Sequence, residues 1–286
     1  MDLLRQDVRF ALRSLRNARS TSIIAILCLA LGIGANTAIF SVVRAVLLEA
    51  LPYAAPQQLV SVNELGTHGP GSVSGAVYFD LKAERRIFSG VVAWGRTNRD
   101  LGDDGEPERL RGVRSTTNLF STLGVKPMIG RTFIDSDAPP TGAPVVVLSE
   151  GLWRRRFAGD PKILGTQITL SNTRVTVIGV MPASFDFPIT TLRSDFWMPL
   201  DFATIGGTTE RNNRSLQVIA RLAPGVDSAS AANSLSLVAK RLAEAYPEAH
   251  KGRGLLVRTV SGTTVGRIRP ALLVLLAAVG LVLLIA

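Results

Sequence analysis

The sequence predicts an α+β domain of two lobes, tethered to a membrane by an N-terminal transmembrane helix and by the start of a second one. Three observations lead to this fold class. An uncharged run extends from Ser20 to Val43, and a wholly apolar run extends from Ala271 to Ala286. Between these runs, short strand-like and helix-like segments alternate, with no low-complexity tract. Such an alternation is typical of a mixed α and β fold.

The composition excludes several other classes of protein. Hydrophobic residues make up 47% of the 286 residues, which rules out intrinsic disorder. The sequence has a single cysteine, Cys28, which rules out a disulfide scaffold. His68 and His250 lie far from Cys28 and from each other in the sequence, so the residue spacing typical of a zinc site does not occur. The net charge is +10. Nucleic-acid binding explains this charge poorly, because the densest basic cluster adjoins an apolar run and lacks interleaved aromatics.

The first element is a predicted transmembrane helix over residues 20–48. Its uncharged part, Ser20 to Val43, would be about 36 Å long as a helix, enough to cross a hydrocarbon layer of about 30 Å. The Ile, Leu, Val and Phe residues between Ile23 and Val43 favour insertion by about 3 to 6 kcal/mol, before the cost of Asn36 and Thr37. A cleaved signal peptide is the alternative, but the uncharged run exceeds the usual apolar length of about 7–15 residues.

A basic segment over residues 1–19 precedes this helix. Its arginines are Arg5, Arg9, Arg13, Arg16 and Arg19. The positive-inside rule therefore places the N-terminus in the cytoplasm and the domain at residues 49–269 on the other side of the membrane. The first three arginines are four residues apart, on one face of a helix, so we expect an amphipathic helix lying along the anionic cytoplasmic leaflet. A solvated basic helix is the alternative.

At the other end, residues 270–286 are expected to be the start of a second transmembrane helix. The sixteen residues after Pro270 would reach only about 24 Å as a helix, and no flanking charge follows Ile285 and Ala286. We therefore expect a span that is cut by the end of the sequence. A buried C-terminal helix of a soluble protein is the alternative.

The domain at residues 49–269 begins with alternating elements. The expected elements are strands at Leu59–Asn63 and Phe88–Trp94, helices at Val77–Arg86 and Thr116–Leu123, and a turn at Thr97–Gly105. The turn is predicted because its composition is rich in Asn, Asp and Gly. Thr116 or Thr117 is expected to cap the second helix, and Gly124 to end it.

The middle of the domain adds a strand, a helix and a hairpin. Val145–Leu148 is expected to be a strand, followed by a helix that Ser149 caps and Gly159 ends. The segments Gln167–Leu170 and Val175–Val180 flank Ser171-Asn172-Thr173 and are expected to form a β-hairpin.

The clearest predicted unit is a strand, a long helix and a strand near the end of the domain. Apolar and polar residues alternate over Ser215–Leu222, as in a half-buried strand. Asp227 or Ser228 is expected to cap a helix, and Leu255–Val260 returns as a strand. The helix is expected to bury Leu235, Val238, Leu242 and Ala245. This arrangement is the core of a split βαβ, ferredoxin-like unit.

No catalytic, cofactor-binding or metal-binding residue is predicted. The sequence has no phosphate-binding loop and no nucleophile elbow, and its acidic clusters lie in turn-rich segments. The pair Gly32-Ile33-Gly34 lies inside the first apolar run rather than after a strand. We expect small residues there to pack against a neighbouring span, since they let two helices approach closely. These residues are Ala30, Gly34 and Ala38.

Several ordered blocks resemble MacB-like, FtsX-like ABC transporter permeases, and in particular the duplicated orphan permeases of acidobacteria. The first block runs from Leu29 to Val43 and continues to Leu51-Pro52-Tyr53. The following blocks are Asn118–Phe120 with Gly130–Phe133, Val145–Ser149 with Leu152–Phe157, Val177–Pro182, and Leu222–Val226. They cover nearly the whole chain in the order of the family.

The resemblance implies a permease of the bacterial inner membrane whose periplasmic core domain joins the first and second spans. It implies a separate ABC-type ATPase subunit, the remaining transmembrane helices of the same permease, and coupling of ATP-driven movement to export or extrusion of cargo. A homodimer or a periplasmic adaptor would be further partners, and the chain itself would be no enzyme. Two alternatives stay open: a membrane-anchored periplasmic sensor or adaptor domain, and a secreted hydrolase released by signal cleavage.

Overall fold

The structure, a computed structural model, describes residues 52–102, 107–189 and 192–260, together with helical residues 23, 30, 32–34, 37 and 274. The predicted basic helix and most of both predicted spans lie outside the described residues. Among the residues described, none of the helices combines the length and the apolar character that crossing a bilayer requires. The described strands belong to one compact unit, Ala50–Thr264.

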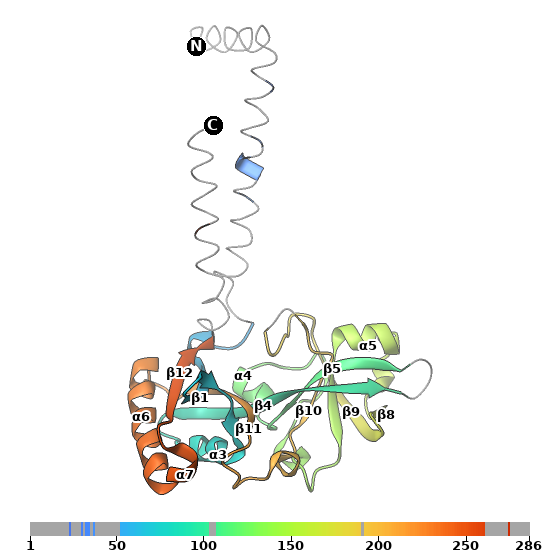
Figure 1. Cartoon of the computed structure of the whole chain (residues 1–286). Helices are drawn as coiled ribbons and strands as arrows, with labels where there is room; N and C mark the ends of the chain where they lie inside the picture. The colour runs from blue at the N-terminus through green and yellow to red at the C-terminus, as the bar shows by residue number, and fades with distance from the viewer. Residues whose placement is uncertain are drawn as a thin grey trace, which may run out of the picture. The chain divides into compact units, whose positions relative to one another are not determined.

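One mixed sheet runs through this unit (Figure 1). Its main strands follow each other in the order β12, β1, β11, β4, β5, β10, β7, β9 and β6. The order divides the unit into two lobes, because the first four strands belong to one α+β motif and the remaining ones to another. The mixed α+β fold class predicted from the sequence is confirmed.

The first lobe has ferredoxin-like topology. Its elements are β1 (Leu59–Gly66), α3 (Gly75–Ala83), β4 (Phe88–Leu101), β11 (Arg214–Leu222), α6 (Ser228–Ala245) and β12 (Gly254–Thr259). Strand β1 is antiparallel to both β11 and β12 and lies between them, and β11 lies between β1 and β4. Two split βαβ units, β1-α3-β4 and β11-α6-β12, therefore interlock. The second of these units was predicted from its strand–helix–strand pattern. Short elements complete the lobe: β2 (Gly69–Gly71), β3 (Val73–Ser74) and α7 (Pro247–His250).

The second lobe is inserted between β4 and β11. Its strands are β5 (Glu108–Ser115), β6 (Ile129–Gly130), β7 (Val145–Ser149), β8 (Gln167–Leu170), β9 (Thr173–Met181) and β10 (Phe196–Pro199), and its helices are α4 (Leu119–Leu123) and α5 (Glu150–Phe157). Strands β7 and β9 are parallel neighbours that α5 and β8 connect, and β10 is parallel to β5. The long β4–β5 hairpin carries the sheet from one lobe into the other.

The first lobe buries alternate residues of its strands against α3 and α6. Val60, Val62, Val218 and Ala220 pack there, and α6 contributes a stripe at helical spacing. The stripe consists of Ala231, Leu235, Val238 and Leu242. Each large aliphatic side chain so buried contributes about 1.5–3 kcal/mol. Ala245, predicted to continue this stripe, is instead exposed, because it is the last residue of α6.

Two predictions about local structure are wrong. Thr97–Leu101, predicted to begin a turn, continues β4 and pairs with β5 as far as Glu108. The ladder and the burial of Leu101 and Leu110 outweigh the turn-like composition. The second error concerns α4, which neither Thr116 nor Thr117 caps. Its N-cap is Asn118, which makes no side-chain cap bond, although Gly124 ends the helix in the left-handed region as predicted.

The other helix boundaries follow local chemistry. Ser149 and Asp227 accept the backbone N–H groups of Leu152 and Ser230, as predicted for the caps of α5 and α6. The helix predicted at Val77–Arg86 starts earlier, because Ser74 caps it, and ends at Ala83. In the predicted β8–β9 hairpin, Ser171 and Asn172 both have positive φ, the conformation of a two-residue hairpin turn.

Candidate functional site

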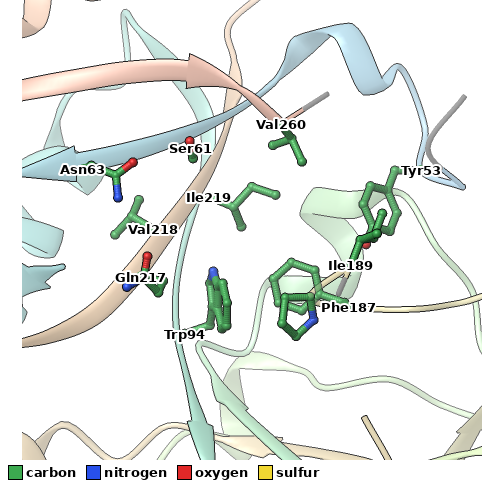
Figure 2. A pocket seen from close by; sticks show the side chains of 11 residues that line it. Tyr53, Ser61, Asn63, Trp94, Phe187, Ile189, Gln217, Val218, Ile219 and Val260 are labelled. Carbon is green, nitrogen blue, oxygen red and sulfur yellow. The ribbon is translucent and has the colours of Figure 1, made fainter. Parts of the chain in front are cut away.

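A cavity of about 310 Å³ lies on the face of the first lobe opposite to the face that α3 and α6 cover. Figure 2 shows side chains that line it. Side chains from β1, β4 and β11, from the loop after β9, and from the residues just before β1 and just after β12 surround it. The lining residues are Tyr53, Ser61, Asn63, Trp94, Phe187, Pro188, Ile189, Gln217, Val218, Ile219 and Val260. We call this cavity the sheet-face pocket. Its volume lies at the lower end of the range for small-ligand sites.

The floor of the pocket follows from strand alternation. Residues that alternate with the core valines point to the other face of the sheet. In one cross-strand row, Asn63 lies opposite Leu256 and Gln217 lies opposite Trp94. In the next row, Ser61 lies between Ile219 and Arg258. The polar positions of the predicted half-buried strands thus form the floor.

The wall is a loop that packs over this floor. Phe187 contacts Trp94 edge-on, with 5.1 Å between the ring centroids. The carbonyl oxygen of Phe187 accepts hydrogen bonds from the Ser194 hydroxyl at 2.9 Å and from the Trp197 indole at 3.0 Å. Ser194 lies just before β10, and Trp197 lies within it. The second lobe therefore fixes the wall of the pocket, whereas the floor belongs to the first lobe.

Tyr53 closes one side of the pocket. Its hydroxyl donates to the backbone oxygen of Asp186, one residue before Phe187. Burial, followed by the nearby charge of Asp186, raises the pKa of Tyr53 far above its usual value. Among the described residues that line the pocket, Tyr53 is the only ionisable side chain, and it stays neutral.

Three polar groups face the pocket from neighbouring strands. The amide nitrogen of Asn63 donates to Gly71 O at 3.1 Å, and that of Gln217 donates to Ser72 Oγ at 2.8 Å. The carbonyl ends of both amides remain as acceptors. The indole N–H of Trp94 has no acceptor within the described part of the chain. These three groups thus offer one donor and two acceptors between apolar walls.

The segments just before β1 and just after β12 meet at this pocket. Tyr53 precedes β1, Val260 follows β12, and both line the cavity. Val60 pairs with Thr259 in the antiparallel β1–β12 ladder, so the start of β1 lies beside the end of β12. Whatever precedes and follows this unit is therefore connected to neighbouring strands at one end of the sheet.

A buried ionic cluster lies on the opposite face of β1. Glu64 is 2% exposed, and its Oε2 lies 2.8 Å from Arg214 Nε, while its Oε1 lies 3.2 Å from His250 Nδ1. Arg253 Nε is 3.8 Å from the same carboxylate. Burial lowers the pKa of His250, although the charge of Glu64 acts in the opposite direction. No group of three acidic, cysteine or histidine side chains that could hold a metal ion occurs in the described residues.

The residues predicted for membrane contact and helix packing remain predictions. Arg5, Arg9, Arg13, Arg16, Arg19 and Ala38 lie outside the described residues. Ala30 and Gly34 are helical and exposed, and a Cβ added to Gly34 would meet no atom within 4 Å. The spacing of these two residues places them on one helix face. Their packing against another span remains a prediction.

The pocket was not predicted as a site. The alternation of Ser215–Leu222 indicated that Gln217 would leave the core, and Trp94 ended a predicted strand. The signal that could have been used is the occurrence of polar residues at successive outward positions of two strands, as at Ser61 and Asn63. Nothing local indicated that Phe187 would close over them.

The fold defines a class of protein: an α+β domain in which two motifs share one mixed sheet, and in which the start of β1 lies beside the end of β12. Comparison with known proteins gives the family. Residues 22–237 match the family model described as MacB-like periplasmic core domain, and the chain belongs to this family. The resemblance recognised in the sequence is thereby confirmed. None of the curated proteins matches the chain in sequence.

Solved structures share the fold at low sequence identity. The periplasmic region of MacB from Actinobacillus actinomycetemcomitans aligns with a TM-score of 0.57 and 16% identity, over 75% of this chain and 94% of that one. A domain of a protein classed as a permease, from Porphyromonas gingivalis, gives 0.56 and 17%, over 72% and 91%. The extracellular domain of the noncanonical ABC-type transporter YknZ from Gram-positive bacteria gives 0.50 and 17%, over 69% and 99%.

Proposed function

We propose that the chain is the N-terminal part of an ABC transporter permease, whose domain lies in the periplasm and couples ATP-driven movement of membrane spans to the export or extrusion of cargo. The family supports a transporter component. The observation that carries the coupling is the neighbouring position of the two chain connections. The segments that lead to the predicted spans join β1 and β12, which are paired strands.

This pairing gives the movement a path. A strand pair is held by a continuous hydrogen-bond ladder, so it moves as one body. If the two predicted spans shift together, the β1–β12 pair carries the shift into the sheet. The sheet continues through β11, β4 and β5 into the second lobe. The proposed role needs rigid packing of this kind and uses no catalytic group in this chain.

The proposal includes a membrane anchor and partners. The helix over residues 20–48 would hold the chain in the bacterial inner membrane with its N-terminus in the cytoplasm, and residues 1–19 would lie on the lipid surface. A separate ABC-type ATPase subunit would supply ATP hydrolysis, since the sequence has no phosphate-binding loop. Ala30, Gly34 and Ala38 would pack against the remaining spans of the permease.

Cross-linking in the membranes of the source bacterium tests the proposal. The tagged chain is purified after mild amine cross-linking, and co-purifying proteins are quantified by mass spectrometry. We expect an ABC-type ATPase that carries a phosphate-binding loop to co-purify in near-stoichiometric amount. We expect this ATPase to be lost when residues 20–48 are replaced by an unrelated transmembrane helix. A stoichiometric signalling protein in place of any ATPase would contradict the proposal and favour a membrane-anchored sensor.

A further inference from the structure

We propose that the sheet-face pocket is a docking site for an acidic, extended peptide segment of a partner protein, which inserts an apolar side chain between Trp94, Phe187 and Ile219. Three observations carry this inference: the apolar walls, the polar groups within them, and the charge of the surrounding sheet face. The site would exist whether or not the chain works with an ATPase.

The walls select a large apolar side chain. The ring of Phe187 stands edge-on to Trp94, and Ile219 and Ile189 complete the apolar surface (Figure 2). Trp94 is only half-buried, so a ligand would remove more of its surface from water. Contact with an aromatic side chain of this kind is typical of the anchor points of protein interfaces.

The polar groups select a peptide over a hydrocarbon chain. The free indole N–H of Trp94 can donate to a peptide carbonyl, and the carbonyl oxygens of Asn63 and Gln217 can accept peptide N–H groups. These groups come from three consecutive strands, which lie about 4.8 Å apart. A bare acyl chain would cover the same groups without bonding them, and covering unbonded polar groups is unfavourable.

The charge of the face selects an acidic segment. Arg258 lies in the same cross-strand row as Ser61 and Ile219, and its guanidinium has no ion-pair partner among the described residues. On the other side of the pocket, alternation along the β4–β5 hairpin places further arginines on this face. Among the described residues, the charged groups on and beside the face are Arg96, Arg109, Arg111, Arg193 and Arg258, against Asp100, Asp186 and Asp195. The surplus is two positive charges, which attract an acidic partner at low and moderate salt.

Peptide binding to the full chain in zwitterionic lipid nanodiscs tests the proposal. The probe is a fluorescent, end-blocked hexapeptide in which Leu-Phe is flanked on each side by two glutamates, and binding is followed by anisotropy against empty nanodiscs. The first control peptide carries lysines in place of the glutamates, and the second carries Ser-Ser in place of Leu-Phe. We expect saturable binding of the probe alone, weakened about tenfold between 0.05 and 0.5 M salt because surface charges are screened.

Two variants distinguish peptide binding at the pocket from non-specific attraction by the protein's positive charge. Trp94→Phe keeps an aromatic ring and removes the N–H, and we expect about fivefold weaker binding. Arg258→Glu should weaken the binding at low salt by at least fivefold, whereas Arg174→Glu, an exposed charge reversal in β9, should leave it unchanged. Circular dichroism spectra check that all three variants are folded.

Three outcomes would overturn the proposal. One is equal binding of the acidic and the lysine peptide. Another is binding that neither Trp94→Phe nor Arg258→Glu alters. The third is protection of Trp94 from acrylamide quenching by decanoate but not by the acidic peptide, which would show that the pocket takes a hydrocarbon chain.

Discussion

Val60 lies directly opposite Thr259 in an antiparallel strand pair, so the chain enters and leaves the described domain at neighbouring positions of one sheet. The residues between them, almost two hundred, form both lobes, and Tyr53 and Val260, just outside this stretch, line the pocket. This relationship underlies the proposed coupling.

The register of β1 and β12 can be tested by a disulfide. In a Cys28→Ser background, Ser61→Cys with Arg258→Cys places two thiols at directly paired positions. Paired Cα atoms lie about 4.5–5.5 Å apart, within the range of a disulfide. We expect complete oxidation on mild treatment, measured as loss of maleimide-reactive thiol. The control pair Asn63→Cys with Arg258→Cys is two residues out of register, about 7–8 Å apart, and should stay reduced. Equal oxidation of both pairs would contradict the register.

The buried carboxylate of Glu64 should depend strongly on Arg214. Arg214→Met removes the arginine that lies closest to a carboxylate with 2% exposure. We expect the free energy of unfolding to fall by about 3 kcal/mol, because the buried charge of Glu64 loses its main partner. For a domain of this size the melting temperature then falls by about 6–12 °C. Differential scanning fluorimetry measures it.

The matched control for Arg214→Met is Arg241→Met. It breaks the ion pair with Glu84, in which the arginine side chain is 66% exposed. Solvent screens such a pair, so its loss should cost less than about 1 kcal/mol. Similar shifts in melting temperature for the two variants would show that the Glu64 cluster contributes little to stability.

Acidification should destabilise the domain through His250. Burial lowers the pKa of His250 in the folded state, against the attraction of Glu64 and together with the repulsion of Arg211 and Arg214. The unfolded chain therefore binds its proton first, near the ordinary value of about 6.5. Stability is full above that pH and falls as the pH drops through 6.5 toward the lower folded pKa.

The measurement is the melting temperature between pH 7.5 and 5.0. We expect a decline in the native chain, a flatter profile for His250→Gln, and an unchanged decline for His68→Gln, since His68 is exposed in the β1–β2 turn. If the profile of His250→Gln matches that of the native chain, the buried histidine does not cause the pH dependence.

Gly112 is required by close packing. A Cβ there would lie 2.2–2.5 Å from the ring of Phe196, which is fully buried. Gly112→Ala must displace that ring, and we expect the free energy of unfolding to fall by about 1–3 kcal/mol. Gly95→Ala is the control on the paired strand, because its nearest neighbour, Ser215 O, would be 3.8 Å away. Chemical unfolding followed by tryptophan fluorescence compares the two, and a smaller loss for Gly112→Ala than for Gly95→Ala would contradict the packing.

Much of the first lobe could be predicted because its signals are local. Alternation over Ser215–Leu222 and the helical stripe from Leu235 to Leu242 each arise within one element, and the cap at Asp227 depends on neighbouring residues only. The cap at Ser149 in the second lobe is local in the same way. The continuation of β4 past Thr97 could not be predicted, since pairing with β5 stabilises a segment whose own composition favours a turn.

The strand β10 and the pocket depend on distant parts of the chain. Phe196–Pro199 is only four residues long and is held between β5 and β7, which lie far from it in the sequence. The wall at Phe187 is placed by hydrogen bonds from Ser194 and Trp197. Such contacts leave no periodic pattern, so the sequence predicted which residues leave the core but not that they line a cavity.

The most direct test of the proposed function is the side of the membrane on which the domain lies. In a Cys28→Ser background, Thr67→Cys places one thiol in the exposed β1–β2 turn, and Ser14→Cys places one in the basic N-terminal segment. Intact spheroplasts are treated with a membrane-impermeant maleimide. We predict labelling of Thr67→Cys in sealed cells and of Ser14→Cys only after permeabilisation. The opposite result, with Ser14→Cys labelled in sealed cells and Thr67→Cys labelled only after permeabilisation, would contradict the proposed topology of a cytoplasmic N-terminus and a periplasmic domain.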